Sequence, residues 1–170
     1  MVQERSGGQA ALICGSVAYD TILQFHDRFK SHILPDKIHI LNVSFLVPDM
    51  RREFGGCAAN IAYSLKLLGD RGIPMATAGH DFGPYRDHMA AQGIALDHIK
   101  VVDDTFTAQA FITTDLDANQ ITAFHPGAMQ QAHLNRVSDA GSAIALLPRS
   151  PDPVTVVPRP AARHRGQAGT

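Results

Sequence analysis

Continuous apolar runs and helical spacings of apolar residues alternate along most of this chain. The run "ALIC" at residues 11–14 ends at Gly15, which predicts a buried strand of a parallel sheet with a loop at its carboxyl end. Apolar positions at helical spacing follow Gly56 as far as Gly69, and a second helical segment covers 83–94. Further strands are predicted over three ranges: 73–78, 98–104 and 142–147. This order predicts an α/β fold with a doubly wound sheet.

Two other segments predict β structure outside that sheet. Residues 38–47 alternate apolar and polar side chains, which is typical of a half-exposed strand. Residues 107–124 contain two short apolar segments around the polar turn "DLDAN". Together they predict a small sheet that acts as a flap, or lid. A hairpin with a purely structural role is the alternative for the second segment.

Composition divides the chain into a folded part, 1–147, and a tail, 148–170. The 170 residues are 45% hydrophobic and 18% charged, as in a soluble globular domain. The tail is rich in proline and arginine and has too few apolar residues for a core, so we expect it to be disordered.

Charge and hydropathy exclude several classes of partner. A net charge of -1 gives no general attraction to nucleic acid or anionic membranes, and no apolar run approaches the roughly 20 residues of a spanning helix. The amino terminus lacks the apolar segment of a signal peptide. Cys14 and Cys57 lie in apolar segments, which favours reduced thiols and a cytoplasmic protein.

The candidate chemistry centres on "REFGGCAANIAYSLKLLG", where two glycines precede a helix. A helix amino terminus presents unpaired N–H groups, and glycines let a ligand approach the backbone closely. Gly55, Gly56 and Asn60 could combine with Asp20, expected in the loop after the first strand, into a clamp for a polyol, because the amide and the carboxylate suit hydroxyl groups. Close packing is the alternative for the glycines, and capping of a turn is the alternative for Asp20.

Other reactive residue types predict no separate site. The histidines are dispersed without ligand spacing, so no metal site is predicted. Cys57 lacks a partner base nearby in the sequence, which favours a packed or substrate-adjacent thiol over a nucleophile. Arg51 and Arg52 are predicted to be a solvated charge cluster, with a ligand phosphate or the lid hinge as alternatives. The tail arginines have no aromatic residues between them for stacking on bases, which argues against nucleic-acid binding.

A longer stretch of the sequence is more informative than the double glycine alone. The stretch "GGCAANIAYSLKLLGDRGIPMATAG" resembles the first signature of the ribokinase-like (PfkB) carbohydrate kinase family, including Asn60, Gly69 and Gly79. "GSVAYD", "GHDFGPYRDHMAAQGI" and "FHPGAM" resemble other segments of that family. The resemblance covers residues 11 to about 147 and is strongest to bacterial adenosine kinases. It implies the N-terminal half of a ribokinase-like doubly wound sheet with a small β lid.

The resemblance also implies roles for individual residues. Those expected to hold the ribose hydroxyls are Ser16, Asp20, Gly56 and Asn60, with Gly55 in the same clamp. Those expected to border the base are Ser44 and Phe124 on the lid strands, predicted at about 38–47 and 107–124. Where an aromatic side chain could stack on the base, this chain has Ala110.

The activity implied is transfer of the ATP γ-phosphoryl group to a hydroxymethyl oxygen of a sugar or nucleoside. The family's catalytic aspartate and Gly-Ala-Gly-Asp motif belong to the second half of its fold, and no such motif occurs here. No catalytic residue is therefore assigned. ATP and Mg²⁺ are expected for a full-length member of the family, and neither is expected to bind this chain alone.

The end of the chain leaves two interpretations open. The resemblance stops near Leu147 inside an apolar segment, which favours a truncated kinase with an out-of-frame tail. A natural short protein with a disordered basic tail is the alternative. The alternative function is a non-catalytic fragment that binds a ligand or dimerises through its lid strands.

Overall fold

The computed structural model describes residues 10–141 and 145–148, and its strands form two sheets of four. The strands are β1 (Ala11–Cys14), β2 (Ala18–Gln24), β3 (Asp49–Gly55), β4 (Gly72–Gly79), β5 (Ile99–Val102), β6 (Ala108–Thr114), β7 (Gln120–His125) and β8 (Ala145–Pro148). The α-helices are α1 (Cys57–Leu67) and α2 (Gly83–Ala91). The 3-10 helices are η1 (Phe29–Ser31), η2 (Pro35–Ile40), η3 (Gly127–Leu134) and η4 (Val137–Ala140).

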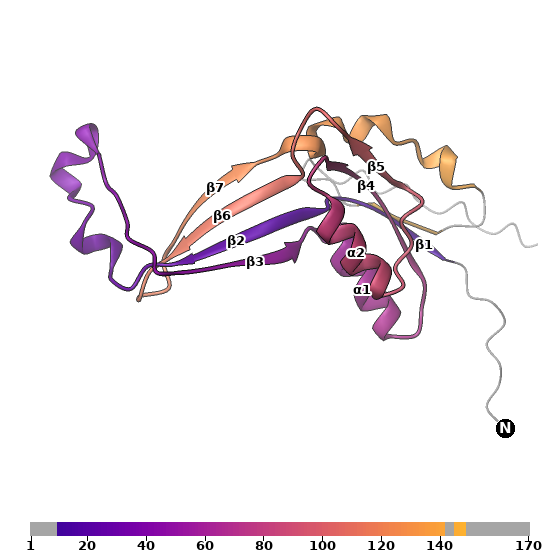
Figure 1. Ribbon diagram of the computed structural model, residues 1–170, viewed down its shortest axis with the longest axis horizontal. Helices are drawn as coiled ribbons and strands as arrows, with labels where there is room; N and C mark the ends of the chain where they lie inside the picture. The colour runs from indigo at the N-terminus through magenta and orange to yellow at the C-terminus, as the bar shows by residue number, and fades with distance from the viewer. Residues whose placement is uncertain (1–9, 142–144, 149–170) are drawn as a thin grey trace, which may run out of the picture.

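The first sheet has the order β5-β4-β1-β8, and all its neighbouring strands are parallel. Helices α1 and α2 lie together on one face of it (Figure 1), over a core that includes Ile13, Ala58 and Met89. Leu12 and Met75 point to the other face, where Ala140 of η4 packs. The α/β fold and both helices predicted from the sequence are thus confirmed. No helix among the described residues has both the length and the apolar composition needed to cross a bilayer.

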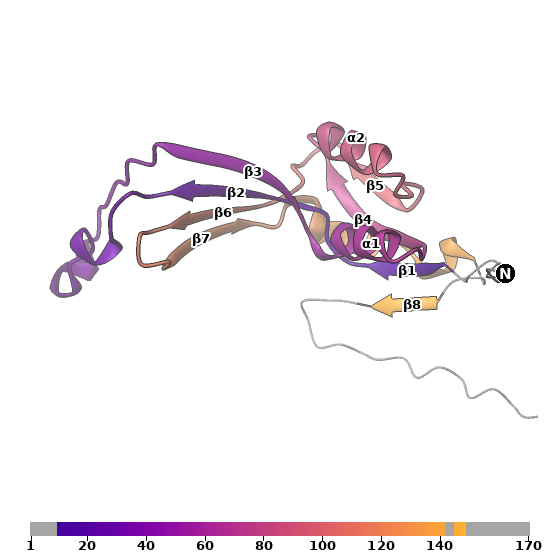
Figure 2. The ribbon, with the colours of Figure 1, turned by 90° about the horizontal axis from the view of Figure 1, so that it is seen from below.

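The second sheet, which we call the lid, has the order β3-β2-β6-β7 and extends away from the helices (Figures 1 and 2). Strand β2 pairs antiparallel with β3 and parallel with β6, while β6 and β7 form an antiparallel hairpin. The hairpin confirms the prediction over 107–124. Strand β2, which carries the chain from the first sheet into the lid, was not predicted from the sequence.

The predicted lid strand at 38–47 is wrong. Residues 35–40 form η2, no strand is assigned from 41 to 48, and the lid strand begins at Asp49. The apolar and polar alternation that suggested a strand does correspond to alternating burial. Val43, Phe45 and Val47 are half-buried, and their even-numbered neighbours are exposed. Phe45 packs on Phe25 and Phe29, but no described strand pairs with this segment, so no ladder of hydrogen bonds forms.

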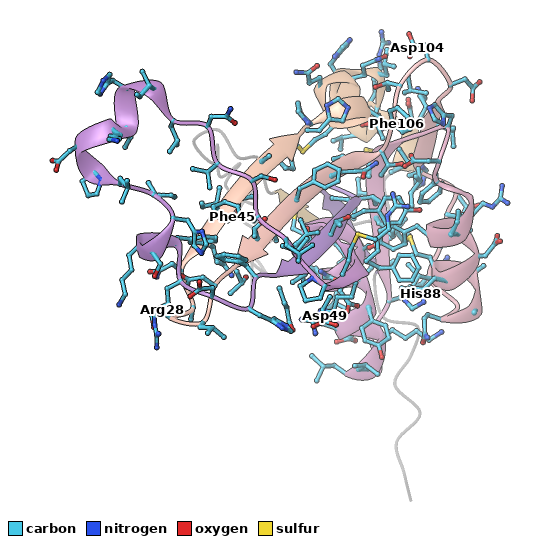
Figure 3. All side chains as sticks on the ribbon, turned by 60° about the vertical axis from the view of Figure 1, so that its left-hand side comes forward. Arg28, Phe45, Asp49, His88, Asp104 and Phe106 are labelled. Atoms are coloured by element: carbon cyan, nitrogen blue, oxygen red, sulfur yellow. The ribbon has the colours of Figure 1, made fainter. Side chains whose placement is uncertain are left out.

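The far end of the lid has its own small core. The ring of Phe45 lies 4.8 Å from that of Phe25 and 5.1 Å from that of Phe29, measured between centroids. In Figure 3, Phe45 and Arg28 lie at this end of the molecule, apart from His88 on α2.

Asp115, in the β6–β7 turn, ties the hairpin to η1. Its carboxylate accepts hydrogen bonds from the backbone N–H groups of Phe29 (3.0 Å), Asp117 (3.0 Å) and Asn119 (2.8 Å). Burial alone would raise the pKa of Asp115, but these donors outweigh it and lower the pKa. The ionised carboxylate therefore organises the turn at neutral pH.

Replacing Asp115 should loosen this end of the lid locally. We expect Asp115→Ala to speed amide hydrogen exchange at Phe29 and Asn119 at least about tenfold, because both amides lose their acceptor. Asp117→Asn is the matched control, since among the described residues the Asp117 carboxylate contacts the side chains of Arg28 and Lys30 and accepts from no backbone N–H. Unchanged exchange in Asp115→Ala would contradict the role given to this carboxylate.

The carboxyl-terminal prediction is tested only in part. A strand is confirmed at Ala145–Pro148, where β8 pairs with β1. Residues 142–144 of the predicted strand, and the tail from residue 149 onward, lie outside the described residues.

Candidate functional site

The double glycine forms the turn between the lid and α1. Gly56 has φ of +91°, and a Cβ there would lie 2.6 Å from Ser16 O and 2.8 Å from Ala18 N. The turn is thus packed directly against the backbone that connects β1 to β2. Close packing, the alternative raised from the sequence, accounts for glycine at position 56.

Ser16 caps the amino terminus of α1 from this neighbouring loop. Its Oγ accepts a hydrogen bond from Cys57 N–H at 3.1 Å, and its carbonyl oxygen accepts one from Ala58 N–H at 3.0 Å. Two of the unpaired N–H groups of the helix are satisfied in this way. The Cys57 thiol lies 3.5 Å from Ser16 Oγ, so Cys57 is packed at the site, in line with its sequence interpretation.

Asp20 lies inside β2, not in a loop after the first strand as the sequence suggested. Its carboxylate covers Gly55, where any Cβ would collide with Asp20 Oδ2. Burial raises the pKa of Asp20. No described residue donates a hydrogen bond to this carboxylate, and no side-chain oxygen in the described part is both buried and unpaired. Asp20 therefore keeps acceptor capacity open to a ligand beside the glycine turn.

Strand pairing in the lid places Asp20 in one row with a residue from each of the other three strands. Asp20 pairs with Glu53 on β3 and Ala110 on β6, and Ala110 pairs with Phe124 on β7. Paired residues point to the same face of a sheet, so these four side chains share one face. We call Glu53, Asp20, Ala110 and Phe124 the binding row. Phe124 is 52% exposed and lies two strands, or about 10 Å, from Asp20.

The structure places Ser44 far from this row and Asn60 on α1, outside the lid sheet. Ser44 precedes Phe45 at the far end of β2, about 20 Å from the glycine turn by the length of that strand. Asn60 is exposed on the first turn of α1, and no hydrogen bond among the described residues joins it to Asp20. It lines a groove of about 220 Å³ with Phe54, Tyr63, Tyr85, His88 and neighbouring residues.

The two arginines of β3 lie on opposite faces of the lid. Arg51 pairs with Glu53 at 3.4 Å on the side of the binding row. Arg52 reaches the lid hinge, one of the alternatives raised from the sequence, where it contacts Asp81 at 3.4 Å. Asp81 was not predicted to be a centre of interactions, although the Gly-x-Asp sequence at the end of β4 was a signal for it. In the described residues, no three His, Cys, Asp or Glu side chains gather as a metal site.

Comparisons with known proteins agree on one family. Residues 18–147 match the family described as "pfkB family carbohydrate kinase". The chain is 35% identical over 111 residues to the nucleoside kinase of Methanothermobacter thermautotrophicus, which covers 64% of this chain and 36% of that protein. The chain thus spans about a third of the length of this relative.

Solved structures give the same result. The Burkholderia thailandensis nucleoside kinase in complex with inosine is 58% identical with a TM-score of 0.65, over 74% of this chain and 39% of that one. The Cryptococcus neoformans ribokinase in complex with ADP, at 21% identity and a TM-score of 0.58, shares the fold over 71% of this chain and 36% of that one.

Proposed function

The chain belongs to the pfkB family of carbohydrate kinases, and from this premise we propose that it supplies the nucleoside-binding part of an ATP-dependent kinase. The reaction of such a kinase transfers the γ-phosphoryl group of ATP to a hydroxymethyl oxygen of the bound nucleoside. One observation carries the assignment of the site. Asp20 is a half-buried carboxylate to which no described residue donates a hydrogen bond, and it lies beside the glycine turn and on the same lid face as Phe124.

The chemistry of these residues suits a ribosyl group. An ionised carboxylate can accept two hydrogen bonds from adjacent sugar hydroxyls. These charge-assisted bonds would offset the free-energy cost of desolvating the carboxylate. Gly55 leaves space for the Asp20 carboxylate itself, Gly56 lets the turn pack on the loop before β2, and Ser16 holds the start of α1 in place. Asn60 would add its amide from the first turn of α1.

A nucleoside fits the binding row better than a free sugar. The exposed ring of Phe124 lies about 10 Å from Asp20, so one ligand could touch both only if it carried a base beyond its sugar. Ala110 between them leaves room for that ligand. The inosine complex of the Burkholderia thailandensis nucleoside kinase, at 58% identity, supports a purine nucleoside, adenosine included.

The residues described here do not supply the rest of the reaction. ATP, with Mg²⁺, provides the phosphoryl group in this family. The sequence contains no Gly-Ala-Gly-Asp motif, and the described residues contain no cluster that fits a metal ion. We therefore assign no residue of this chain to ATP, Mg²⁺ or the catalytic base, and confine its role to binding and orienting the acceptor.

A second candidate is a fragment that dimerises through its lid. Strands β3 and β7 are the edge strands of the lid in the described part of the chain. The face opposite the binding row exposes Met50 (70%), Phe111 (42%) and Ile121 (43%). An open edge and an exposed apolar face favour association. Phosphoryl transfer from ATP would support the kinase, whereas a ligand-free dimer in sedimentation without any transfer would support this second candidate.

Calorimetric titration of the purified chain tests the proposed function. We expect inosine and adenosine to bind at least about tenfold more tightly than ribose or fructose, because only nucleosides reach Phe124. Phe124→Ala should abolish this preference and leave ribose binding unchanged. Phe111→Ala, on the same hairpin but the opposite face, is the matched control and should keep the preference. Equal binding of ribose and inosine by the unmodified chain would refute the nucleoside assignment.

A further inference from the structure

A single carboxylate of the α/β part collects hydrogen bonds from the lid. Asp81 lies between β4 and α2, and its Oδ1 accepts from Thr107 N–H at 2.7 Å. Its Oδ2 accepts from Gln109 Nε2 at 3.2 Å and from Arg52 Nη2 at 3.4 Å. The Tyr19 hydroxyl donates to the Asp81 carbonyl oxygen at 3.0 Å. We call these five residues the Asp81 cluster.

The cluster is partly buried and closely packed where the lid meets the α/β part. The Asp81 side chain is 19% exposed, and the Arg52 guanidinium lies 3.7 Å from the centre of the Tyr19 ring. Burial alone would raise the pKa of Asp81, but the hydrogen bonds from Thr107 and the charge of Arg52 outweigh it and lower the pKa. The cluster therefore holds an ionised carboxylate at neutral pH.

The members of the cluster alternate with members of the binding row along three lid strands. Tyr19 precedes Asp20 on β2, Arg52 precedes Glu53 on β3, and Gln109 precedes Ala110 on β6. Neighbouring residues of a strand point to opposite faces of the sheet. The Asp81 cluster thus holds the lid from one face, through residues that immediately precede three members of the binding row on the other face.

The two parts also meet at the backbone here. Thr107 Oγ1 accepts a hydrogen bond from Gly79 N–H at 3.0 Å, and a Cβ at Gly79 would collide with the backbone of Phe106 and Thr107. The end of β4 therefore fixes the start of β6. The side chains around Asp81 extend this attachment to β2 and β3.

We propose that Asp81 is a positioning residue that sets the height and angle of the binding row over the glycine turn. It touches no ligand itself. By holding β2, β3 and β6 from the opposite face, it orders Asp20 before the ligand arrives and so lowers the entropy lost on binding. The proposal rests on the proposed function for the identity of the ligand but not for the geometry of the lid.

The experiment combines inosine calorimetry with a ligand-free measurement of lid position. We expect Asp81→Asn, which keeps the shape but removes the charge, to raise the Kd for inosine about tenfold. Spin labels at Ser44 on the lid and Ala91 at the end of α2, introduced as a genetically encoded amino acid, report the distance distribution between the two parts. We expect a broader distribution in Asp81→Asn without ligand.

Two further variants separate positioning from a merely structural role. Arg52→Gln removes the other charge from a partly exposed side chain, so it tests the pair even if Asp81→Asn folds poorly. If the two residues act as a pair, the double variant should bind inosine no more weakly than the worse single variant. Asp117→Asn, whose carboxylate pairs with Arg28 and Lys30 at the far end of the lid, is the matched control and should match the unmodified chain in both measurements.

The outcomes distinguish this inference from the proposed function. If the unmodified chain does not bind inosine, the proposed function fails. The distances between the spin labels then test the positioning role of Asp81 by themselves. An unchanged distance distribution in both Asp81→Asn and Arg52→Gln would overturn the positioning role. Additive losses of affinity in the double variant would overturn it as well, since independent effects on stability would then explain both variants.

Discussion

We expect Gly56→Ala to lower the free energy of unfolding by at least about 3 kcal/mol. Two effects add at this position. The backbone has φ of +91°, which a side chain disfavours, and the new Cβ would lie within 2.8 Å of Ser16 O, Val17 Cα and Ala18 N. All three atoms belong to the backbone, so no side-chain rotation relieves the clash. Urea unfolding followed by circular dichroism measures the change.

Gly69→Ala is the matched control for this prediction. Gly69 also has a positive φ, +83°, at the end of α1, but a Cβ there would meet nothing within 4 Å. The variant should lose only the cost of the left-handed backbone, about 1 kcal/mol. Equal losses in the two variants would mean that the loop before β2 does not pack on the glycine turn as described.

The second large effect concerns Asp20. We expect Asp20→Asn to weaken inosine binding by about tenfold to a hundredfold at pH 7, because hydrogen bonds to a charged acceptor contribute roughly 1.5–3 kcal/mol. Asp97→Asn, a change at an exposed aspartate between α2 and β5, should leave the affinity unchanged. Calorimetry of both variants decides, and full affinity in Asp20→Asn would remove this carboxylate from the site.

The raised pKa of Asp20 predicts how both the stability of the chain and its affinity for inosine change with pH. Because burial raises the pKa, the folded chain binds a proton at a higher pH than the unfolded chain does. The contribution of this group to stability therefore falls as pH rises through the range above its ordinary value of about 4. Asp20→Asn should raise the melting temperature at pH 7 while it weakens binding. In the unmodified chain, affinity should fall on acidification at a higher pH than for an ordinary aspartate.

Local sequence signals predicted most elements of the fold. Helix α1 follows from apolar residues at helical spacing between two glycines, and the β6–β7 hairpin follows from two apolar segments around a polar turn. These are interactions between residues close in the chain, which a sequence pattern records directly. The failure at 38–47 has the same origin. Alternating burial is a local property that Phe45 and its neighbours have, but a strand also needs a partner, which they lack.

The sequence by itself determined the α/β class, the family signature and the residues around the double glycine, because these depend on residue type and short spacing. Only the tertiary structure decided that Asp20 lies within a lid strand, in register with Ala110, and that Ser44 lies at the far end of the lid. It alone brought Arg52, Asp81 and Gln109 together. Register and long-range contacts arise from pairing between distant segments, and no pattern along the chain records which strands become neighbours.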